Sequence, residues 1–298
     1  MFRKINDLRA STFLFSVICD RAQNTARTLF GVERLPCDNQ VRNLLDPLSP
    51  RALDGVFVEV CEGLERHGAL ANFRGLNDQL LIAMDGTQYY ASTTMHGKNC
   101  LTRQTSAGPT LYYHTAITPV IVCPGRTEVI ALAPEYLMPQ DGHDKQDCER
   151  AAGKRWLVKH AASLAPHGIT VLGDDLYSNQ PLCALALQNG CHFLFVCKPD
   201  SHASLSKRLA FWQDSGASKT LERRRRNGRF TEVTHYRSIN DVGLRGGRDA
   251  LSVHWLEITV VHAKTGEQRY DNSFITNHQL MAVSIAEVAQ AGRGRWKK

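Results

Sequence analysis

Two short, mainly apolar runs that each lead into an aspartate constrain this chain more than any other feature. Residues 80–84 (LLIAM) precede Asp85, and residues 169–172 (ITVL) precede Gly173 and Asp174. Continuous apolar runs of this length, bounded by turn residues, predict strands that are buried on both faces. Such strands belong to sheets that helices cover, so the pattern favours an α/β fold.

The rest of the chain supplies the other parts of such a fold. Residues 1–78 carry apolar positions at three- and four-residue spacing and predict a helical N-terminal region. Residues 79–199 predict a core in which strands and helices alternate. Residues 200–281 predict a β-rich insertion punctuated by glycines, and residues 282–298 predict the start of a final core helix.

The core and the insertion are expected to contain the following elements. Strands are expected at residues 80–84, 112–123, 128–137, 169–172 and 192–198 of the core, and at 230–237, 252–263 and 270–276 of the insertion. Helices are expected up to about residue 164, with Asp144 and Asp147 as caps, and over about residues 181–188.

Composition indicates the cellular compartment and the charge of a partner. The nine cysteines are an odd number and sit mostly in apolar runs, which indicates reduced thiols in a cytoplasmic protein and not a disulfide framework. No run approaches the roughly 20 apolar residues that span a bilayer, so we expect no membrane association. Residues 13–19 resemble the core of a signal peptide, but Asp7, Arg9 and the lack of a small-residue cleavage site favour a buried helix. The net charge of +7 is a mild indication of an anionic partner such as nucleic acid.

Asp85 and Asp174 are the residues most suited to chemistry. Ligands bind at the carboxyl ends of strands in α/β sheets, and two carboxylates placed together there need a cation, for which Mg²⁺ or Mn²⁺ is suitable. The alternative is that each aspartate caps a turn, because Asp-Gly and Gly-Asp pairs are common in turns. Asp175 competes with Asp174 for the second position, but neighbouring side chains on a strand point in opposite directions.

Five strings of residues, in this order, are similar to the insertion-sequence-four-type DDE transposases of prokaryotes. They are MDGTQYYAS at 84–92, PEYLMPQDGHDKQDCER at 134–150, LGDDLYSN at 172–179, VCKPDSH at 196–202 and AQAGRGRWKK at 289–298. The similarity extends from about residue 29 to the last residue. It implies a ribonuclease-H-like mixed sheet flanked by helices, in which the β-rich insertion separates the last core strand from the final helix.

The resemblance also implies an activity. Asp85 and Asp174 would be the first two acids of a catalytic triad that holds two Mg²⁺ ions about 4 Å apart, with Mn²⁺ as a substitute. One ion would activate water or a 3′-hydroxyl and the other would stabilise the leaving oxygen, so that one site cleaves and transfers DNA strands. The partners would be double-stranded DNA, at the element's ends and at the target, and a second copy of the chain during synapsis.

The third acid of the family falls immediately after Lys298, and Gly292 occupies the position where the family has tyrosine. Glu287 lies about 18 Å from that place along a helix and cannot substitute. We therefore expect weakened metal binding and little or no catalysis from the chain as given. A catalytically inactive DNA-binding remnant is the second hypothesis, and an unrelated metal-dependent nuclease or phosphatase is the third.

Four residues are candidates for DNA contact. The resemblance makes Arg295 a phosphate contact, with Lys297 beside it, although cations are also favoured at helix C-termini. Trp296 is either a base-stacking residue or a buried aromatic. Lys198 follows a core strand and either faces DNA or is an ordinary loop residue. The run of arginines at 223–226 either contacts the DNA backbone or is a solvated basic loop. His96 with Cys100 is a weak candidate pair for zinc.

Overall fold

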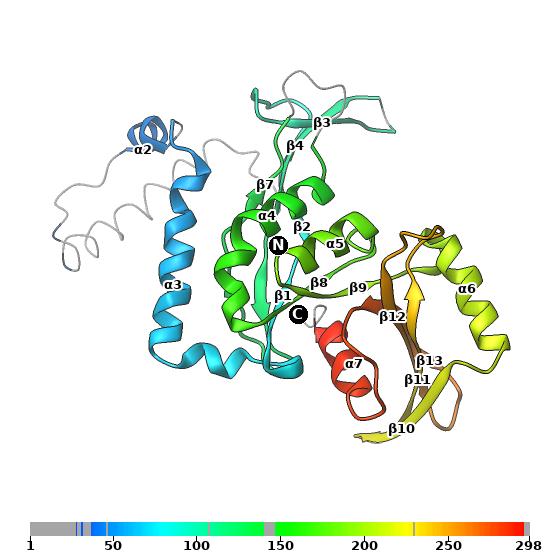
Figure 1. The fold of residues 1–298 in the computed structure, drawn as a ribbon. Coiled ribbons are helices and arrows are strands. Elements are labelled where there is room, and N and C mark those ends of the chain that lie inside the picture. Colours follow the sequence, from blue (N-terminus) through cyan, green and yellow to red (C-terminus); the bar gives the residue numbers. More distant parts are fainter. Residues whose placement is uncertain are drawn as a thin grey trace. The chain divides into compact units, whose positions relative to one another are not determined.

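The computed structural model describes residues 28, 31, 37–45, 47–106, 108–139, 147–228 and 230–294. They fall into two compact units that divide between Leu53 and Asp54. The first unit contains helix α2 (Asp38–Leu45) and a 3₁₀ turn (Pro50–Leu53). The second unit contains both sheets and the remaining helices (Figure 1). The described residues before 79 form helices and turns, apart from an isolated β-bridge between Arg74 and Leu80.

A nine-stranded mixed sheet forms the centre of the second unit, in the order β10-β11-β12-β13-β9-β8-β1-β5-β6. Its strands are β1 (Leu80–Ala83), β5 (Val120–Val122), β6 (Ile130–Ala131), β8 (Ile169–Gly173), β9 (His192–Val196), β10 (Lys219–Asn227), β11 (Phe230–Gly243), β12 (Ser252–His262) and β13 (Gln268–Thr276). Strand β8 runs parallel to both β1 and β9, and the other neighbours are antiparallel. The protein is therefore a mixed α/β protein.

The apolar runs of the sequence are buried on both faces of this sheet. Leu80 and Ile82 of β1 belong to a core cluster with Trp156, while Leu81 and Ala83 belong to a second cluster on the other face. The first cluster packs helices α4 (Glu149–Leu164), α5 (Gln180–Gln188) and α6 (Ala203–Asp214), and the second packs α7 (Ile285–Gly294). Because both faces are covered, β1 shows no alternation of polar and apolar residues.

A smaller sheet follows β1 directly. It contains β2 (Gly86–Ser92), β3 (Leu101–Gln104) and β4 (Thr110–Ile117) in the order β2-β4-β3, with the short β7 (Glu135–Tyr136) also on β4. Figure 1 shows β3 and the adjoining part of β4 at one end of the unit. From the sequence, only a turn at residues 85–87 is expected here, and neither β2 nor β3 was predicted.

Two predicted strands are each split in two. The strand expected over residues 112–123 becomes β4 and β5, which lie in different sheets, and the strand expected over 128–137 becomes β6 and β7. Pro119 lies at the first break and Pro134 at the second. Proline has no N–H to donate to a neighbouring strand, so the chain changes sheet at these points.

The predicted insertion is continuous with the core sheet. Strands β10 to β13 form an antiparallel meander, and β13 pairs with β9, joining Phe274 to Val196 in register. The four arginines at 223–226 lie on the edge strand β10 and not in a loop. Helix α6, between β9 and β10, was not predicted.

Packing explains why position 292 on α7 is a glycine. A Cβ atom there would lie 2.8 Å from Cε1 of Phe274, so the ring of β13 fills the space that a larger residue would need.

The expected final helix is confirmed through Gly294. Residues 13–19, Asp144, Arg295, Trp296 and Lys297 lie outside the described residues. In the described part of the chain, no helix has the length and apolar character required to cross a membrane.

Candidate metal centre

The structure brings together the two aspartates that follow apolar strands. Strands β1 and β8 are parallel neighbours, and Ala83 pairs with Leu172. Continuing this register by two residues places Asp85 opposite Asp174, at the carboxyl edge of the sheet. The sheet therefore places side by side two carboxylates that are 89 positions apart in the sequence.

Glu149 supplies a third carboxylate. One oxygen from each of Asp85, Glu149 and Asp174 lies within 4.8 Å of the other two. Glu149 is the first residue of α4, which leads back to β8. Among the described residues, no other group of three histidines, cysteines or acids is placed to hold a metal ion, and His96 and Cys100 belong to no such group.

Glu149 was not predicted as a site residue, although a signal for it was present in the sequence. A helix that leads into a strand of an α/β sheet runs back along that sheet, so its first turn lies near the carboxyl ends of the parallel strands. An acid in the first turn of the predicted helix was therefore a candidate for the site. Glu287, on α7, is not part of the cluster.

Three glycines make room for this arrangement. A Cβ atom on Gly86 would lie 2.5 Å from Oε2 of Glu149. A Cβ atom on Gly153 would lie 2.9 Å from Cε1 of Tyr177, and one on Gly173 would lie 2.8 Å from Cβ of Tyr177. The absence of side chains at these positions lets Glu149 approach the start of β2 and lets the Tyr177 ring lie between α4 and β8.

Tyr177 is completely buried beside the carboxylates. Burial raises the pKa of its hydroxyl, and the negative charge of Glu149 raises it further. The Tyr177 hydroxyl interacts with the Glu149 carboxylate, which raises the pKa of Tyr177 further and acts to lower that of Glu149.

The electrostatics of the site favour a cation. Burial raises the pKa of Glu149, and the charges of Asp174 and Asp85 raise it further. Like charges held this close repel one another unless a positive charge lies between them. Three carboxylates are hard oxygen donors of the kind that Mg²⁺ and Mn²⁺ prefer, so the residues present fit a divalent ion.

An ion-pair network fixes the segment before Glu149. Arg155, two turns along α4, donates to Oδ2 of Asp147 at 2.7 Å and to Oε1 of Glu135 at 2.8 Å. Although burial acts to raise the pKa of Asp147, the hydrogen bonds from Arg155 hold it below its usual value. Asp147 was predicted to cap α4, but Cys148 holds the N-cap position and Asp147 pairs with Arg155 instead.

The remaining predicted residues have separate positions. Asp175 points away from the cluster, because its Oδ1 accepts the backbone N–H of Lys198 at 2.6 Å and lies 3.4 Å from Nε2 of His202. Lys198 itself follows β9 and is exposed at the same edge of the sheet as Asp174.

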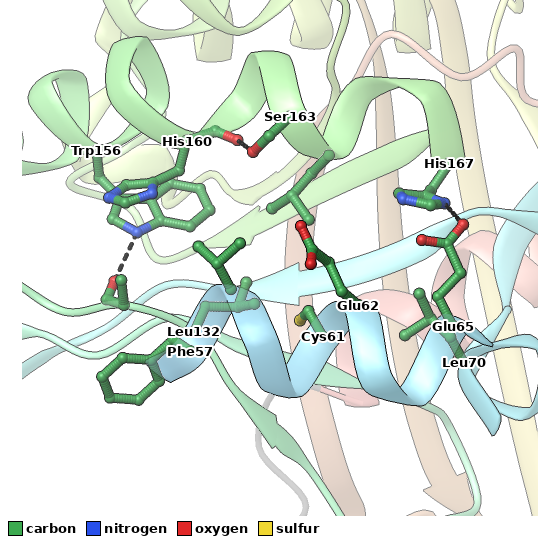
Figure 2. A pocket seen from close by; sticks show the side chains of 13 residues that line it. Phe57, Cys61, Glu62, Glu65, Leu70, Leu132, Trp156, His160, Ser163 and His167 are labelled. Carbon is green, nitrogen blue, oxygen red and sulfur yellow. Dashed lines mark hydrogen bonds and ion pairs between the residues drawn. The ribbon is translucent and has the colours of Figure 1, made fainter. Parts of the chain in front are cut away.

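A cavity of about 170 Å³ lies elsewhere, between α3 (Asp54–Arg66) and the second half of α4 (Figure 2). Its lining includes Phe57, Cys61 and Leu132, and the ion pair between His167 and Glu65 lies at one end. His160, another lining residue, is eleven positions after Glu149 and thus roughly 16 Å along the helix. This cavity is not part of the carboxylate site.

No protein-family model matches the chain, and no curated protein is similar enough to count as a relative.

Proposed function

We propose that this chain is a metal-dependent enzyme that cleaves and transfers DNA strands, of the insertion-sequence-four-type DDE transposase kind. The observation that carries the proposal is the meeting of Asp85, Glu149 and Asp174 within 4.8 Å at the carboxyl edge of two parallel strands. The family resemblance in the surrounding strings supplies the reaction, which is an in-line displacement at a DNA phosphodiester.

The three carboxylates would hold Mg²⁺, as two ions, or Mn²⁺ in its place. A metal bound there would activate a water or 3′-hydroxyl nucleophile and stabilise the leaving oxygen. The contribution of the chain is to place the ligands before the metal arrives. The parallel strands fix Asp85 and Asp174, while the Arg155 network and the glycines fix Glu149. Positioning of this precision is what metal-assisted phosphoryl transfer requires of a protein.

Glu149 bears on which of the hypotheses the site supports. The resemblance places the third acid after Lys298, but Glu149 gives the site a third carboxylate within the chain itself. The proposal therefore does not require a residue beyond 298, and it favours an active enzyme over the inactive DNA-binding remnant.

The arrangement of the core agrees with the ribonuclease-H-like fold that the resemblance implies. Strands β6, β5, β1, β8 and β9 are consecutive in the sheet, β1, β8 and β9 share one direction, and α4 and α5 connect them on one face. The basic surplus of the chain, the exposed Lys198 and the arginines of β10 suit a DNA partner. Such an enzyme would act in the cytoplasm of a prokaryote, with a dimer pairing two element ends.

A plasmid-nicking assay tests the proposal. Supercoiled plasmid is incubated with the chain in Mg²⁺ or in EDTA, and nicked product is measured by gel. We expect nicking in Mg²⁺ only, and its loss in Asp85→Asn, Glu149→Gln and Asp174→Asn. Asp175→Asn is the matched control, because Asp175 points away from the cluster, and it should retain nicking.

Two results would contradict the proposal. Nicking that survives Asp85→Asn would come from another site or a contaminant. Binding of DNA without nicking in either Mg²⁺ or Mn²⁺ would instead support the inactive remnant.

A further inference from the structure

The small sheet that begins at Gly86 carries an unusual set of side chains. We call residues 86–117, which include β2, β3 and β4, the ribbon. One face of the ribbon gathers five rings, those of Tyr89, Tyr90, His96, Tyr112 and His114. Tyr112 and His114 are two positions apart on β4 and therefore lie on the same face.

The rings contact one another in two groups. Tyr89 stacks on His114, with ring centroids 5.8 Å apart and planes within 9°, and Tyr90 packs against the same imidazole at 5.5 Å. His96 stacks on Tyr112 at 4.3 Å. Tyr90 also donates to the carbonyl of Met95 at 2.7 Å, which ties the loop to the strand.

These rings are not enclosed in a core. Tyr89 is 57% exposed and His96 is exposed, while Tyr90, Tyr112 and His114 are half-buried. A β-bulge lies between Gln88 and Tyr90, because β4 pairs Thr115 with Gln88 and His114 with Tyr90. The bulge leaves Tyr89 outside the ladder, and bulges of this kind re-aim side chains next to active sites.

The charge of the ribbon is complementary to a phosphate backbone. Between Asp85 and Glu128 the sequence has no acidic residue. Lys98 and Arg103 are exposed on the ribbon, and Arg103, which pairs with Leu111 and lies 5.4 Å from the centre of the Tyr113 ring, is on the face opposite the five rings. A ribbon with exposed rings, cations and no carboxylates favours a nucleic acid over an acidic or apolar partner.

The ribbon is also continuous with the metal centre. Strand β2 begins at the residue after Asp85, and its Gly86 lies against the carboxylate of Glu149. A DNA strand whose phosphate occupies the carboxylate site would therefore lie at the base of the ribbon.

From this juxtaposition we infer that the ring face of the ribbon binds unpaired bases of a single DNA strand beside the scissile phosphate. The inference rests on the proposed function, because it specifies the form of DNA at that site. Bases in a duplex are stacked on one another and hide their faces, whereas unpaired bases offer a face that tyrosine and histidine rings can stack on.

The test is a binding measurement that does not depend on catalysis. Fluorescence anisotropy with labelled dT20 and with a 20-base-pair duplex is recorded in EDTA at one fixed salt concentration. Stacking of one base contributes about 1–3 kcal/mol, so Tyr89→Ala should weaken binding of dT20 at least about fivefold. Tyr89→Phe, which keeps the ring, should bind within about twofold of the wild type.

A matched control separates the ribbon from aromatic exposure in general. Phe211 on α6 is 67% exposed, and Phe211→Ala should leave binding unchanged. His96→Ala gives a second variant at an exposed position, and thermal unfolding confirms that each variant folds.

Two results would overturn the inference. One is unchanged dT20 binding in both Tyr89→Ala and His96→Ala. The other is duplex binding that is as tight as that of dT20 and equally weakened, which would show that the ribbon contacts the backbone. If plasmid nicking is absent while Tyr89→Ala still weakens dT20 binding, the proposed function fails and the base-binding surface stands.

Discussion

Replacing Gly86 by alanine tests how the metal centre is built. The added Cβ would lie 2.5 Å from Oε2 of Glu149, whereas ordinary contacts begin near 3.4 Å, so the carboxylate must retreat by about 0.9 Å. Because the carboxylate is the end of a flexible side chain, we expect the free energy of unfolding in EDTA to change by less than about 1 kcal/mol. Metal ligands must be held within about 0.5 Å, so the affinity for Mn²⁺ should fall about 10- to 100-fold.

Calorimetric titration with MnCl₂ measures the affinity, and urea unfolding in EDTA measures the stability. Gly97→Ala is the matched control, because it lies in the same ribbon and a Cβ there would have nothing within 4 Å. The reasoning is refuted if Gly86→Ala binds Mn²⁺ as tightly as the wild type, or if Gly97→Ala loses as much affinity.

Three further predictions concern stability and are measured by urea unfolding. Burial and the neighbouring carboxylates raise the pKa of Glu149, so its charge destabilises the metal-free fold at neutral pH. Glu149→Gln should therefore be more stable than the wild type in EDTA at pH 7.5. A loss of stability in this variant would contradict the prediction. Burial and two neighbouring histidines lower the pKa of His278 from 6.5 to about 4. As pH falls, the unfolded chain binds the proton before the folded chain does. The free energy of unfolding should therefore fall as pH falls from 6.5 towards 4, by about 2 kcal/mol at pH 5. If the free energy of unfolding of His278→Gln depends on pH as steeply as that of the wild type, His278 is not the cause. Gly292→Ala should lower the free energy of unfolding by about 1–3 kcal/mol, because its Cβ would lie 2.8 Å from the Phe274 ring. A variant as stable as the wild type would show that the ring moves aside freely.

The aspartate pair could be predicted because its signals are local. Each of Asp85 and Asp174 follows a run whose apolar character reports burial on both faces, and parallel neighbours place their carboxyl ends at one edge. Asp175 was separated from Asp174 by the alternation of strand side chains, and the structure shows it facing Lys198 and His202.

Glu149 and the ribbon depend on distant parts of the chain, and this is why they were missed. The place of Glu149 is set by the path of α4 back to β8 and by the Arg155 pairs, and its position in the first turn of the predicted helix was the one local signal. Residues 85–87 were predicted as a turn because Asp85-Gly86 is a common turn pair, and no strand was predicted over 88–92. Their strand character comes from pairing with β4, which the structure shows.

The family relationship and the activity remain predictions from the resemblance, and the structure contributes the site on which they depend. The residues named as DNA contacts at 295–297 lie outside the described part of the chain, so DNA binding can be tested at Lys198, at the arginines of β10 and at the ribbon.

Binding of Mn²⁺ followed by electron paramagnetic resonance tests most directly whether three carboxylates form one metal site. Free Mn²⁺ gives a sharp signal that disappears on binding, so the affinity is measured without DNA or turnover. We predict that the wild type binds Mn²⁺ and that Asp85→Asn, Glu149→Gln and Asp174→Asn each weaken binding about tenfold or more, while Asp175→Asn binds like the wild type. A wild-type protein that leaves the signal unchanged, or a Glu149→Gln variant that binds as tightly as the wild type, would contradict the account.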